Sequence, residues 1–337
     1  MFDDSQLAED LRSALERRAA LFAALAAENT NAYRLFHGSN EGCPGLTVDR
    51  YGPQLLIQSF HTPLSPDDLA TIEAISSSHF QPSEVVYNDR SAPHSRRKDT
   101  DVVSAHTLLC QELNLNYAVM GKHAGQDPLL FLDLRVGRRY VLAQAAGCSV
   151  LNLCAYSCGL GLAAMQGGAS EVWNVDFSSR YLEIGRENAR LNRLENPQHH
   201  FLQSDFFTAV KQWAGLPVAF RRGKGIESRS YPKLAPRQFD LVCLDPPRWS
   251  KSPFGTIDLI RDYQSVFKPA LLATRPGGRL LCTNNVAEVQ REAWAESLMR
   301  CASKAGREIQ SLQWLEPEAD FPSRDGQHPL KIAVLQV

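Results

Sequence analysis

Two carboxylates in this chain each end an apolar run, the position that ligand-binding and catalytic carboxylates occupy in α/β proteins. The position of Asp176 suits an acceptor for two ribose hydroxyl groups. Asp245 is followed by Pro246 and Pro247, which fix a rigid turn at the end of a predicted strand. We therefore predict a nucleoside-binding carboxylate at Asp176 and a catalytic edge at Asp245, Pro246 and Pro247.

Residues 149–192 supply the elements that must position Asp176. An apolar run passes through a turn of small residues into helical sequence rich in Ala and Met. Two glycines stop that helix, a second apolar run leads to Asp176, and Ser178 or Ser179 can cap the next helix. Such an order forms a crevice in which glycines let a ligand approach the backbone and a helix N-terminus faces it. We expect a nucleoside cofactor there.

Two nucleoside cofactors, NAD(P) and S-adenosylmethionine, fit such a crevice. Gly159 and Gly161 do not decide between them, because this pair lacks the third glycine of a full dinucleotide fingerprint. The rigid turn at Asp245, Pro246 and Pro247 does decide, since a dehydrogenase has no need of it. S-adenosylmethionine is therefore the predicted cofactor.

Five motifs make the chain resemble a known family. In chain order they are PGLTVDRYGPQLLIQ (44–58), GQDPLLFLDLRVGR (125–138), NLCAYSCGLGLAA (152–164), VDFSSRYLEIGRENARLN (175–192) and DPPRW (245–249). Together they resemble the S-adenosylmethionine-dependent methyltransferases of large-subunit (23S) ribosomal RNA, which act on cytosine C5 or guanine N7. The resemblance covers residues 33–337, and the motifs occur in the family's order.

The resemblance implies an α/β, Rossmann-like class I methyltransferase fold with a seven-stranded mixed sheet and an antiparallel last strand. It also implies two domains: a helix plus a small α+β accessory domain for RNA or substrate in residues 1–120, and the methyltransferase domain in residues 121–337. Local patterns agree for the first domain. Residues 5–27 predict one amphipathic helix, and residues 47–58 predict a hairpin with a two-residue turn.

The resemblance also assigns residues to the cofactor. In the family, the segment 125–138 closes over the cofactor, and the residue at Asp205 bonds to the adenine amino group while an adjacent aromatic side chain covers the ring. The predicted cofactor-binding residues are Phe131, Asp133, Arg135, Asn152, Tyr156, Ser157, Gly159, Asp176, Phe177, Ser178, Asp205 and Phe206. Asp205 also suits a helix N-cap, and both roles can coexist. Alternatively, Phe131 packs in the core and Asp133 pairs with an arginine.

Two departures from the family pattern fall on these motifs. Residues 127–130 replace the usual Lys-Thr-Gly-Phe, and Cys158 stands where the family commonly has glycine. A cysteine there is strained if the backbone needs a positive φ. Cys154 and Cys158 lie four residues apart without a second ligand pair, and the nine histidines show no ligand spacing, so we expect no metal.

Residues in the predicted strand after Gly278 limit which atom of a base the enzyme can methylate. Cytosine C5 is a poor nucleophile, so C5 enzymes use a cysteine thiolate. Where the resemblance places that cysteine the chain has Asn285, and Cys282 lies too deep in the strand. Guanine N7 or an exocyclic amine is therefore favoured, with Asn284 or Asn285 on a guanine edge. Trp249 either stacks on an extruded base or is a partly buried aromatic side chain.

A formal net charge of −1 means that any RNA surface must be a local patch. Residues 90–98 predict a basic loop, and residues 216–238 form a basic insertion with six Lys or Arg against one Glu. Both suit contact with RNA phosphates, and Tyr231 can stack on a base. Each can also be an ordinary surface loop with no such role.

The composition, 44% hydrophobic and 22% charged, is that of a globular protein. Eight cysteines without paired C-x-x-C spacing indicate a reducing compartment, and neither a signal peptide nor a membrane-length apolar run occurs. We expect a cytoplasmic enzyme, without a membrane partner, that methylates a base of 23S rRNA. The alternatives are a cofactor-binding RNA protein without activity and a methyltransferase with a non-RNA substrate.

Overall fold

The computed structural model describes residues 4–91, 107–121, 128–218 and 231–337. The chain divides into two compact units. The first comprises Met1–Arg135 and Pro317–Gln327, and the second comprises Val136–Glu316 and His328–Val337. A segment near the C-terminus therefore belongs to the N-terminal unit.

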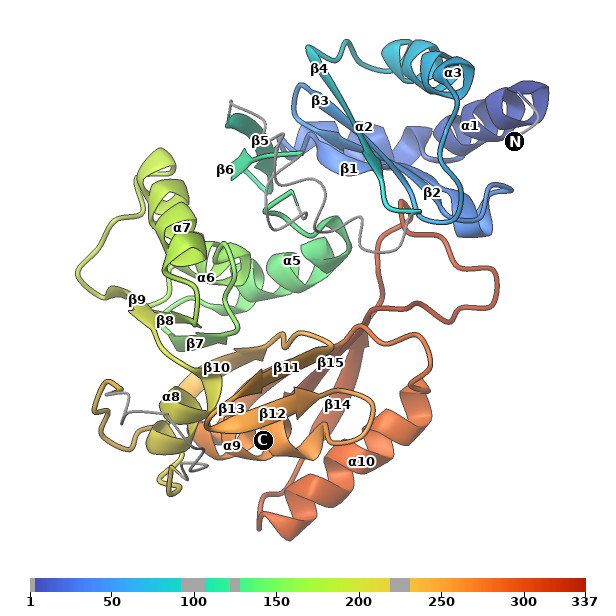
Figure 1. Cartoon of the computed structure of the whole chain (residues 1–337). Coiled ribbons are helices and arrows are strands. Elements are labelled where there is room, and N and C mark those ends of the chain that lie inside the picture. The colour runs from blue at the N-terminus through green and yellow to red at the C-terminus, as the bar shows by residue number, and fades with distance from the viewer. Residues whose placement is uncertain (1–3, 92–106, 122–127, 219–230) are drawn as a thin grey trace. The chain divides into compact units, whose positions relative to one another are not determined.

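A four-stranded sheet forms the centre of the first unit (Figure 1). In spatial order its strands are β1 (Ala32–His37), β2 (Leu46–Tyr51), β3 (Gln54–Ser59) and β4 (Glu84–Asp89). β2 and β3 form the predicted hairpin, with Tyr51 opposite Gln54 across a two-residue turn. Helix α3 (Pro66–Ser77) connects β3 to β4, and these two strands are parallel. The unit also contains η1 (Gly38–Asn40), β5 (Leu108–Glu112), β6 (Leu115–Val119) and η3 (Leu132–Leu134).

Two helices, α1 (Asp4–Arg17) and α2 (Ala19–Ala27), replace the single helix predicted for residues 5–27. That prediction was wrong at Arg18, whose buried guanidinium donates hydrogen bonds to the Glu41 carboxylate at 2.6 and 2.8 Å. A buried charge must be paired, and this pair forms at the residue that separates the two helices. The expected apolar face is nevertheless buried at Leu7, Leu11 and Phe22.

A seven-stranded sheet forms the second unit, in the order β14-β15-β13-β10-β7-β8-β9. The strands are β7 (Ser149–Leu153), β8 (Glu171–Asp176), β9 (His199–Gln203), β10 (Phe239–Leu244), β13 (Thr274–Asn284), β14 (Ser311–Leu315) and β15 (Lys331–Gln336). From β13 to β9 neighbouring strands are parallel, whereas β15 is antiparallel to both of its neighbours. The predicted Rossmann-like class I sheet with a reversed last strand is confirmed.

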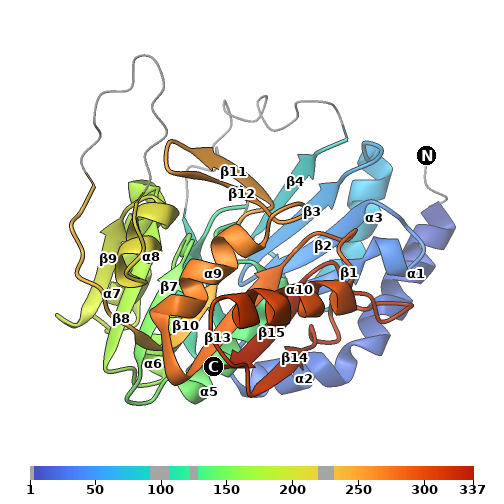
Figure 2. The ribbon, with the colours of Figure 1, turned by 90° about the horizontal axis from the view of Figure 1, so that it is seen from below.

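Helices cover both faces of this sheet (Figures 1 and 2). On one face lie α5 (Arg135–Gln144), α6 (Gly159–Gln166) and α7 (Ser179–Leu191), and on the other lie α8 (Phe206–Trp213), α9 (Gln264–Ala273) and α10 (Arg291–Lys304). A hairpin of β11 (Trp249–Ser252) and β12 (Gly255–Asp258) follows β10. Among the described helices, none is both long and apolar enough to span a membrane.

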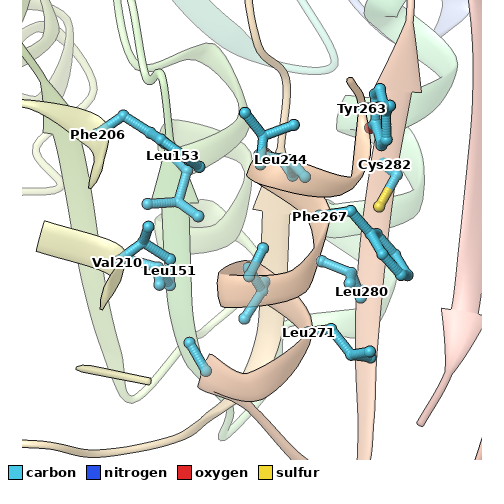
Figure 3. Close-up of a cluster of buried hydrophobic side chains, with 14 of the residues drawn as sticks. Leu151, Leu153, Phe206, Val210, Leu244, Tyr263, Phe267, Leu271, Leu280 and Cys282 are labelled. Carbon is cyan, nitrogen blue, oxygen red and sulfur yellow. The ribbon is translucent and has the colours of Figure 1, made fainter. Parts of the chain in front are cut away.

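The core between this sheet and helices α8 and α9 is built from large apolar side chains (Figure 3). Members of this cluster are Leu151, Leu153, Leu244, Leu280, Phe206, Val210, Phe267 and Leu271. Burying a side chain of this size stabilises the fold by about 1.5–3 kcal/mol. The packing fixes the carboxyl ends of the central strands relative to one another.

Cys158, the residue before α6, has a left-handed backbone with a φ of 66°, so the condition under which a cysteine is strained there is met. This conformation costs a non-glycine residue about 1–2 kcal/mol. Its thiol faces Gly185 of α7, where an added Cβ would come within 2.4 Å of Cys158 Sγ. The absence of a side chain at Gly185 therefore makes room for the cysteine.

We predict that Gly185→Ala lowers the free energy of unfolding by about 1–3 kcal/mol, because the new methyl group overpacks against the thiol. Adding Cys158→Gly removes the two atoms in closest conflict, so the double variant should recover most of that loss. Urea unfolding of the wild type, both single variants and the double variant measures the coupling. Additive losses would show that the thiol is not the obstacle.

Candidate active site

The ends of four parallel strands bring polar side chains to one edge of the second unit's sheet. β10, β7, β8 and β9 are neighbours in that order, so the residues that follow them meet at the same edge. Cys154 directly follows β7, and the pKa of its thiol reflects the polar groups at this edge. Burial raises its pKa well above the ordinary value, and the charges of Asp176, Asp245 and Asp205 raise it further. The strand order places the carboxylates that follow β8, β9 and β10 at the same edge as this thiol.

Asp176 ends β8 with a side chain that is almost buried, since the residue is 7% exposed. Its Oδ1 accepts a hydrogen bond from Ser178 N at 2.9 Å, and its Oδ2 accepts one from Tyr156 N at 2.9 Å. Burial raises the pKa of Asp176 above its ordinary value, although these backbone donors act in the opposite direction. The backbone of Phe177 also donates to this carboxylate. A carboxylate has about four acceptor sites, so capacity for a hydroxyl group remains.

The turn between β7 and α6 has a strained backbone. Cys154, Tyr156 and Cys158 have φ values of 57°, 50° and 66°. Non-glycine residues in this region cost about 1–3 kcal/mol each, and they persist only where surrounding contacts hold them. Here Ala155 N donates to Val175 O at 2.9 Å, in addition to the bond from Tyr156 N described above. The neighbouring strand therefore fixes the conformation of the turn.

Helix α6 packs closely on β8 because Gly161 has no side chain. A Cβ at Gly161 would lie 1.8 Å from Asn174 Oδ1, an atom that accepts a hydrogen bond from Asn152 Nδ2 at 2.9 Å. Gly161 thus has the helix-packing role that the dinucleotide fingerprint gives to its third glycine. Of the predicted cofactor residues here, Asn152 and Ser157 are buried and Gly159 is the first residue of α6.

Asp205 follows β9 and caps α8, as its alternative role predicted. Its Oδ1 accepts hydrogen bonds from Phe207 N at 2.8 Å and Thr208 N at 3.3 Å. Because the cap uses Oδ1, Oδ2 can accept from another donor such as an amino group. Of the two predicted aromatic residues, Phe206 is buried, whereas Phe177 is 71% exposed and offers its ring to a ligand.

Asp245 is oriented by a residue that the sequence did not single out. Thr283 Oγ1 in β13 donates a hydrogen bond to Asp245 Oδ1, and Thr283 O accepts one from Tyr263 Oη at 2.8 Å. Burial raises the pKa of Tyr263 well above its ordinary value, which keeps this hydroxyl protonated. The sequence signal that could have indicated Thr283 was a polar residue at the end of an apolar run. Pro246 is buried and Pro247 is exposed.

The β11–β12 hairpin, which was not predicted, directly follows the Asp-Pro-Pro turn. Trp249 begins it, opposite Asp258. The residue is 61% exposed, so it is not the partly buried aromatic side chain considered as its alternative. Arg248 beside it forms an exposed ion pair with Glu288 at 3.2 Å. An aromatic surface is thus open to solvent four residues after Asp245.

The two asparagines at the end of β13 differ in environment. Asn284 is fully buried, where its Nδ2 donates to Leu259 O at 3.4 Å and its Oδ1 accepts from Val286 N at 3.0 Å. Asn285 is exposed. Cys282 is fully buried, and burial raises the pKa of its thiol. Of these residues, Asn285 is the one accessible to a substrate.

Three predicted cofactor residues belong to the first unit. Phe131 is 41% exposed, and Asp133 is half-buried in η3. Arg135 is buried, and its guanidinium donates to Glu318 at 2.8 Å and to Asp320 at 2.6 Å. These ion pairs attach the segment Pro317–Gln327 to the first unit.

Parts of the predicted RNA and cofactor surfaces lie outside the described residues. They are residues 92–98 of the basic loop, residues 125–127 of the lid motif and residues 219–230 of the basic insertion. Tyr231 is described, and its ring packs edge-on against Phe254 at 5.6 Å between centroids. Within the described residues, no group of three His, Cys, Asp or Glu side chains is placed to hold a metal ion.

The side chains at this edge fit a nucleoside that carries a sugar diol and an amino group. Asp176 provides acceptors for hydroxyl groups, Asp205 provides an acceptor for an amino group, and Phe177 provides an exposed ring. The adenosine part of S-adenosylmethionine has these groups.

Comparison with known proteins agrees with this chemistry. A sequence profile of S-adenosylmethionine-dependent methyltransferases matches residues 33–336. The chain is 30% identical over 319 residues to a Deinococcus radiodurans protein named ribosomal RNA large subunit methyltransferase. This alignment covers 92% of this chain and 73% of that protein. It is 28% identical over 305 residues to ribosomal RNA large subunit methyltransferase I of Aeromonas hydrophila, and that alignment covers 88% of this chain and 71% of the relative.

Solved structures share the fold. A methyltransferase crystallised with SAH has a TM-score of 0.79 at 20% identity, over 100% of this chain and 82% of that one. A methyltransferase from Agrobacterium tumefaciens has a TM-score of 0.61 at 15% identity, with 91% and 90% covered. Since the profile matches nearly the whole chain and the sheet is the one expected, the chain belongs to the S-adenosylmethionine-dependent methyltransferase family, with S-adenosylmethionine as its cofactor.

Proposed function

We propose that this enzyme methylates a base of large-subunit ribosomal RNA, at guanine N7 or at an exocyclic amine. The carrying observation is the 61% exposed Trp249 next to the Asp245 turn, because a base taken out of its stack needs an aromatic surface to rest on. The names of the relatives, both ribosomal RNA large subunit methyltransferases, support 23S rRNA as the acceptor. The proposed site of action is the cytoplasm.

Residues of the second unit hold the cofactor in this proposal. S-adenosylmethionine supplies an electrophilic methyl group when it is bound. Asp176 accepts from the ribose hydroxyls, Asp205 Oδ2 accepts from the adenine amino group, and Phe177 covers the ring. The residues that shape the pocket through the turn and the helix caps are Asn152, Tyr156, Ser157, Gly159, Ser178 and Phe206.

The first unit serves as the RNA- or substrate-binding domain in this proposal. The cofactor roles predicted for Phe131 and Asp133 rest on the resemblance of their segment to the family. Arg135 supports that segment through its ion pairs with Glu318 and Asp320.

Cytosine C5 is disfavoured as the target because the site lacks a reactive thiol at the required position. Cys282 is fully buried and its pKa is raised, so it is not a ready nucleophile. Asn285, which is exposed at the end of β13, offers an amide to a guanine edge.

The proposed mechanism requires little more than alignment and a proton acceptor. Guanine N7 carries a lone pair that reacts when it is held in line with the methyl group. An exocyclic amine must in addition lose a proton. The Asp245 carboxylate, oriented by Thr283, is the group that takes it.

Methyl transfer from labelled S-adenosylmethionine to 23S rRNA tests the function. RNA from cells lacking the gene should accept label that ribonuclease releases, and mass spectrometry should find N7-methylguanosine or an N-methylated exocyclic amine. 5-Methylcytidine would overturn the target atom. Label that survives ribonuclease would indicate a non-RNA substrate, and no label would indicate a cofactor-binding RNA protein without activity.

We predict that Asp176→Ala weakens binding of S-adenosylhomocysteine at least about tenfold, because hydrogen bonds to charged groups contribute about 1.5–3 kcal/mol. Isothermal titration calorimetry measures the affinity. Glu183→Ala is the matched control, since Glu183 is an exposed carboxylate on the helix that follows Asp176. Asp176→Asn keeps the size of the side chain if the alanine variant is unstable. Unchanged affinity in a folded Asp176 variant would remove this residue from the cofactor site.

We predict that Trp249→Ala lowers kcat/KM for RNA by about 5- to 150-fold, the equivalent of one stacked base, whereas Trp249→Phe retains most activity. Affinity for the cofactor should stay unchanged in both variants. Ile260→Ala is the control, because Ile260 is another exposed apolar side chain just beyond the hairpin. A loss of the same size in Trp249→Phe would argue against stacking.

A further inference from the structure

The β11–β12 hairpin is docked through two aromatic contacts near its tip. Phe254 packs edge-on against Tyr231, with ring centroids 5.6 Å apart. Gly255 lies against Phe207 of α8 so closely that an added Cβ would come within 2.4 Å of that ring. The hairpin is therefore fixed to α8 and to the end of the basic insertion.

A lysine ammonium group lies over the ring of Tyr231, and another lies over the ring of Phe207. Lys233 Nζ lies 4.3 Å from the centroid of Tyr231, and Lys211 Nζ lies 5.0 Å from the centroid of Phe207. A cation over an aromatic ring gains about 0.5–1 kcal/mol at exposed sites. This contact orients the ammonium group and leaves its N–H donors available to an anion. The rings that dock the hairpin thus also position two cations beside it.

The hairpin itself carries a third lysine, Lys251, between its tip and Trp249. Side chains alternate between the two faces of a strand, so Lys251 lies on the same face as Trp249. Both are exposed, whereas Phe254 and Ile257 are buried. Lys251 thus lies between the hairpin tip, where the two ring-bound lysines are, and the exposed indole.

Lys233 and Lys251 are exposed, and Lys211 is half-buried. The ion pairs described in this unit use arginine or histidine as the cation, so none of the three lysines is paired with a carboxylate in the part of the chain that the structure describes. The nearest acidic side chain by register, Asp258 opposite Trp249, accepts hydrogen bonds from Ile260 N and Arg261 N at 3.1 Å.

We propose that Lys211, Lys233 and Lys251 form a track for the phosphates of single-stranded RNA next to the target nucleotide, with Trp249 at its end. This inference rests on the proposed function and adds the surface that holds the flanking nucleotides. Cations that follow an aromatic platform match the alternation of phosphate and base in a single strand. Phosphate contacts of this kind position the RNA without reading its sequence.

The experiment compares a triple variant with a charge-matched control. Lys211→Ala/Lys233→Ala/Lys251→Ala removes the track, and Lys268→Ala/Arg300→Ala/Lys304→Ala removes three exposed cations of α9 and α10. The probe is a single-stranded RNA of about 12 nucleotides, within the range of single-strand binding sites. Binding is titrated at several salt concentrations, and methyl transfer to 23S rRNA is measured in parallel.

The track variant should bind this RNA about 10- to 100-fold more weakly at 0.1 M salt, with a salt slope lower by about 2, since each phosphate contact contributes about 0.7. Its KM for RNA should rise while kcat and cofactor affinity stay near wild type. An unchanged slope, or an equal loss in the control, overturns the track. So does an equal loss of binding to a polyglutamate peptide, which would indicate a general anion surface. Absence of salt-dependent RNA binding by the wild type would instead count against the proposed function.

Discussion

The hydrogen bonds of the Asp176 carboxylate are the contact on which the active edge depends. One oxygen holds the backbone of Tyr156 after β7, and the other holds Ser178 before α7, so a single side chain joins the ends of two strands. The turn that it holds contains three left-handed, non-glycine residues, which would relax without such support. The raised pKa of Asp176 reflects the cost of burying a charge for this purpose.

A second constraint fixes Asp245, the proposed catalytic carboxylate. Asp245 leaves β10, the strand between β7 and β13, and Thr283 on β13 orients its carboxyl group. The β11–β12 hairpin begins directly after the turn, at Trp249. The tip of this hairpin packs on Phe207 in α8, the helix that Asp205 caps. The strand ends after β9 and β10 are therefore joined through packing as well as through the sheet.

Much of this arrangement was predictable from the sequence, because it depends on local patterns. Apolar runs ending in Asp176 and Asp245 predicted strand ends at one edge, and the turn at Gly52 predicted the β2–β3 hairpin. The features that were not predicted depend on contacts between distant residues. Arg18 separates two helices and pairs with the distant Glu41, and Arg135 attaches residues more than 180 positions away through Asp320. The β11–β12 hairpin was missed because its strands have four residues each and little apolar alternation. The assigned roles of the site residues remain predictions.

Cys154 illustrates a further consequence of gathering carboxylates at one edge. The thiolate is the nucleophilic form of a cysteine, and the protonated thiol reacts far less readily. Burial and the three neighbouring carboxylates keep the proton on this sulfur by raising its pKa. The same negative charges thereby keep Cys154 in its less reactive, protonated form.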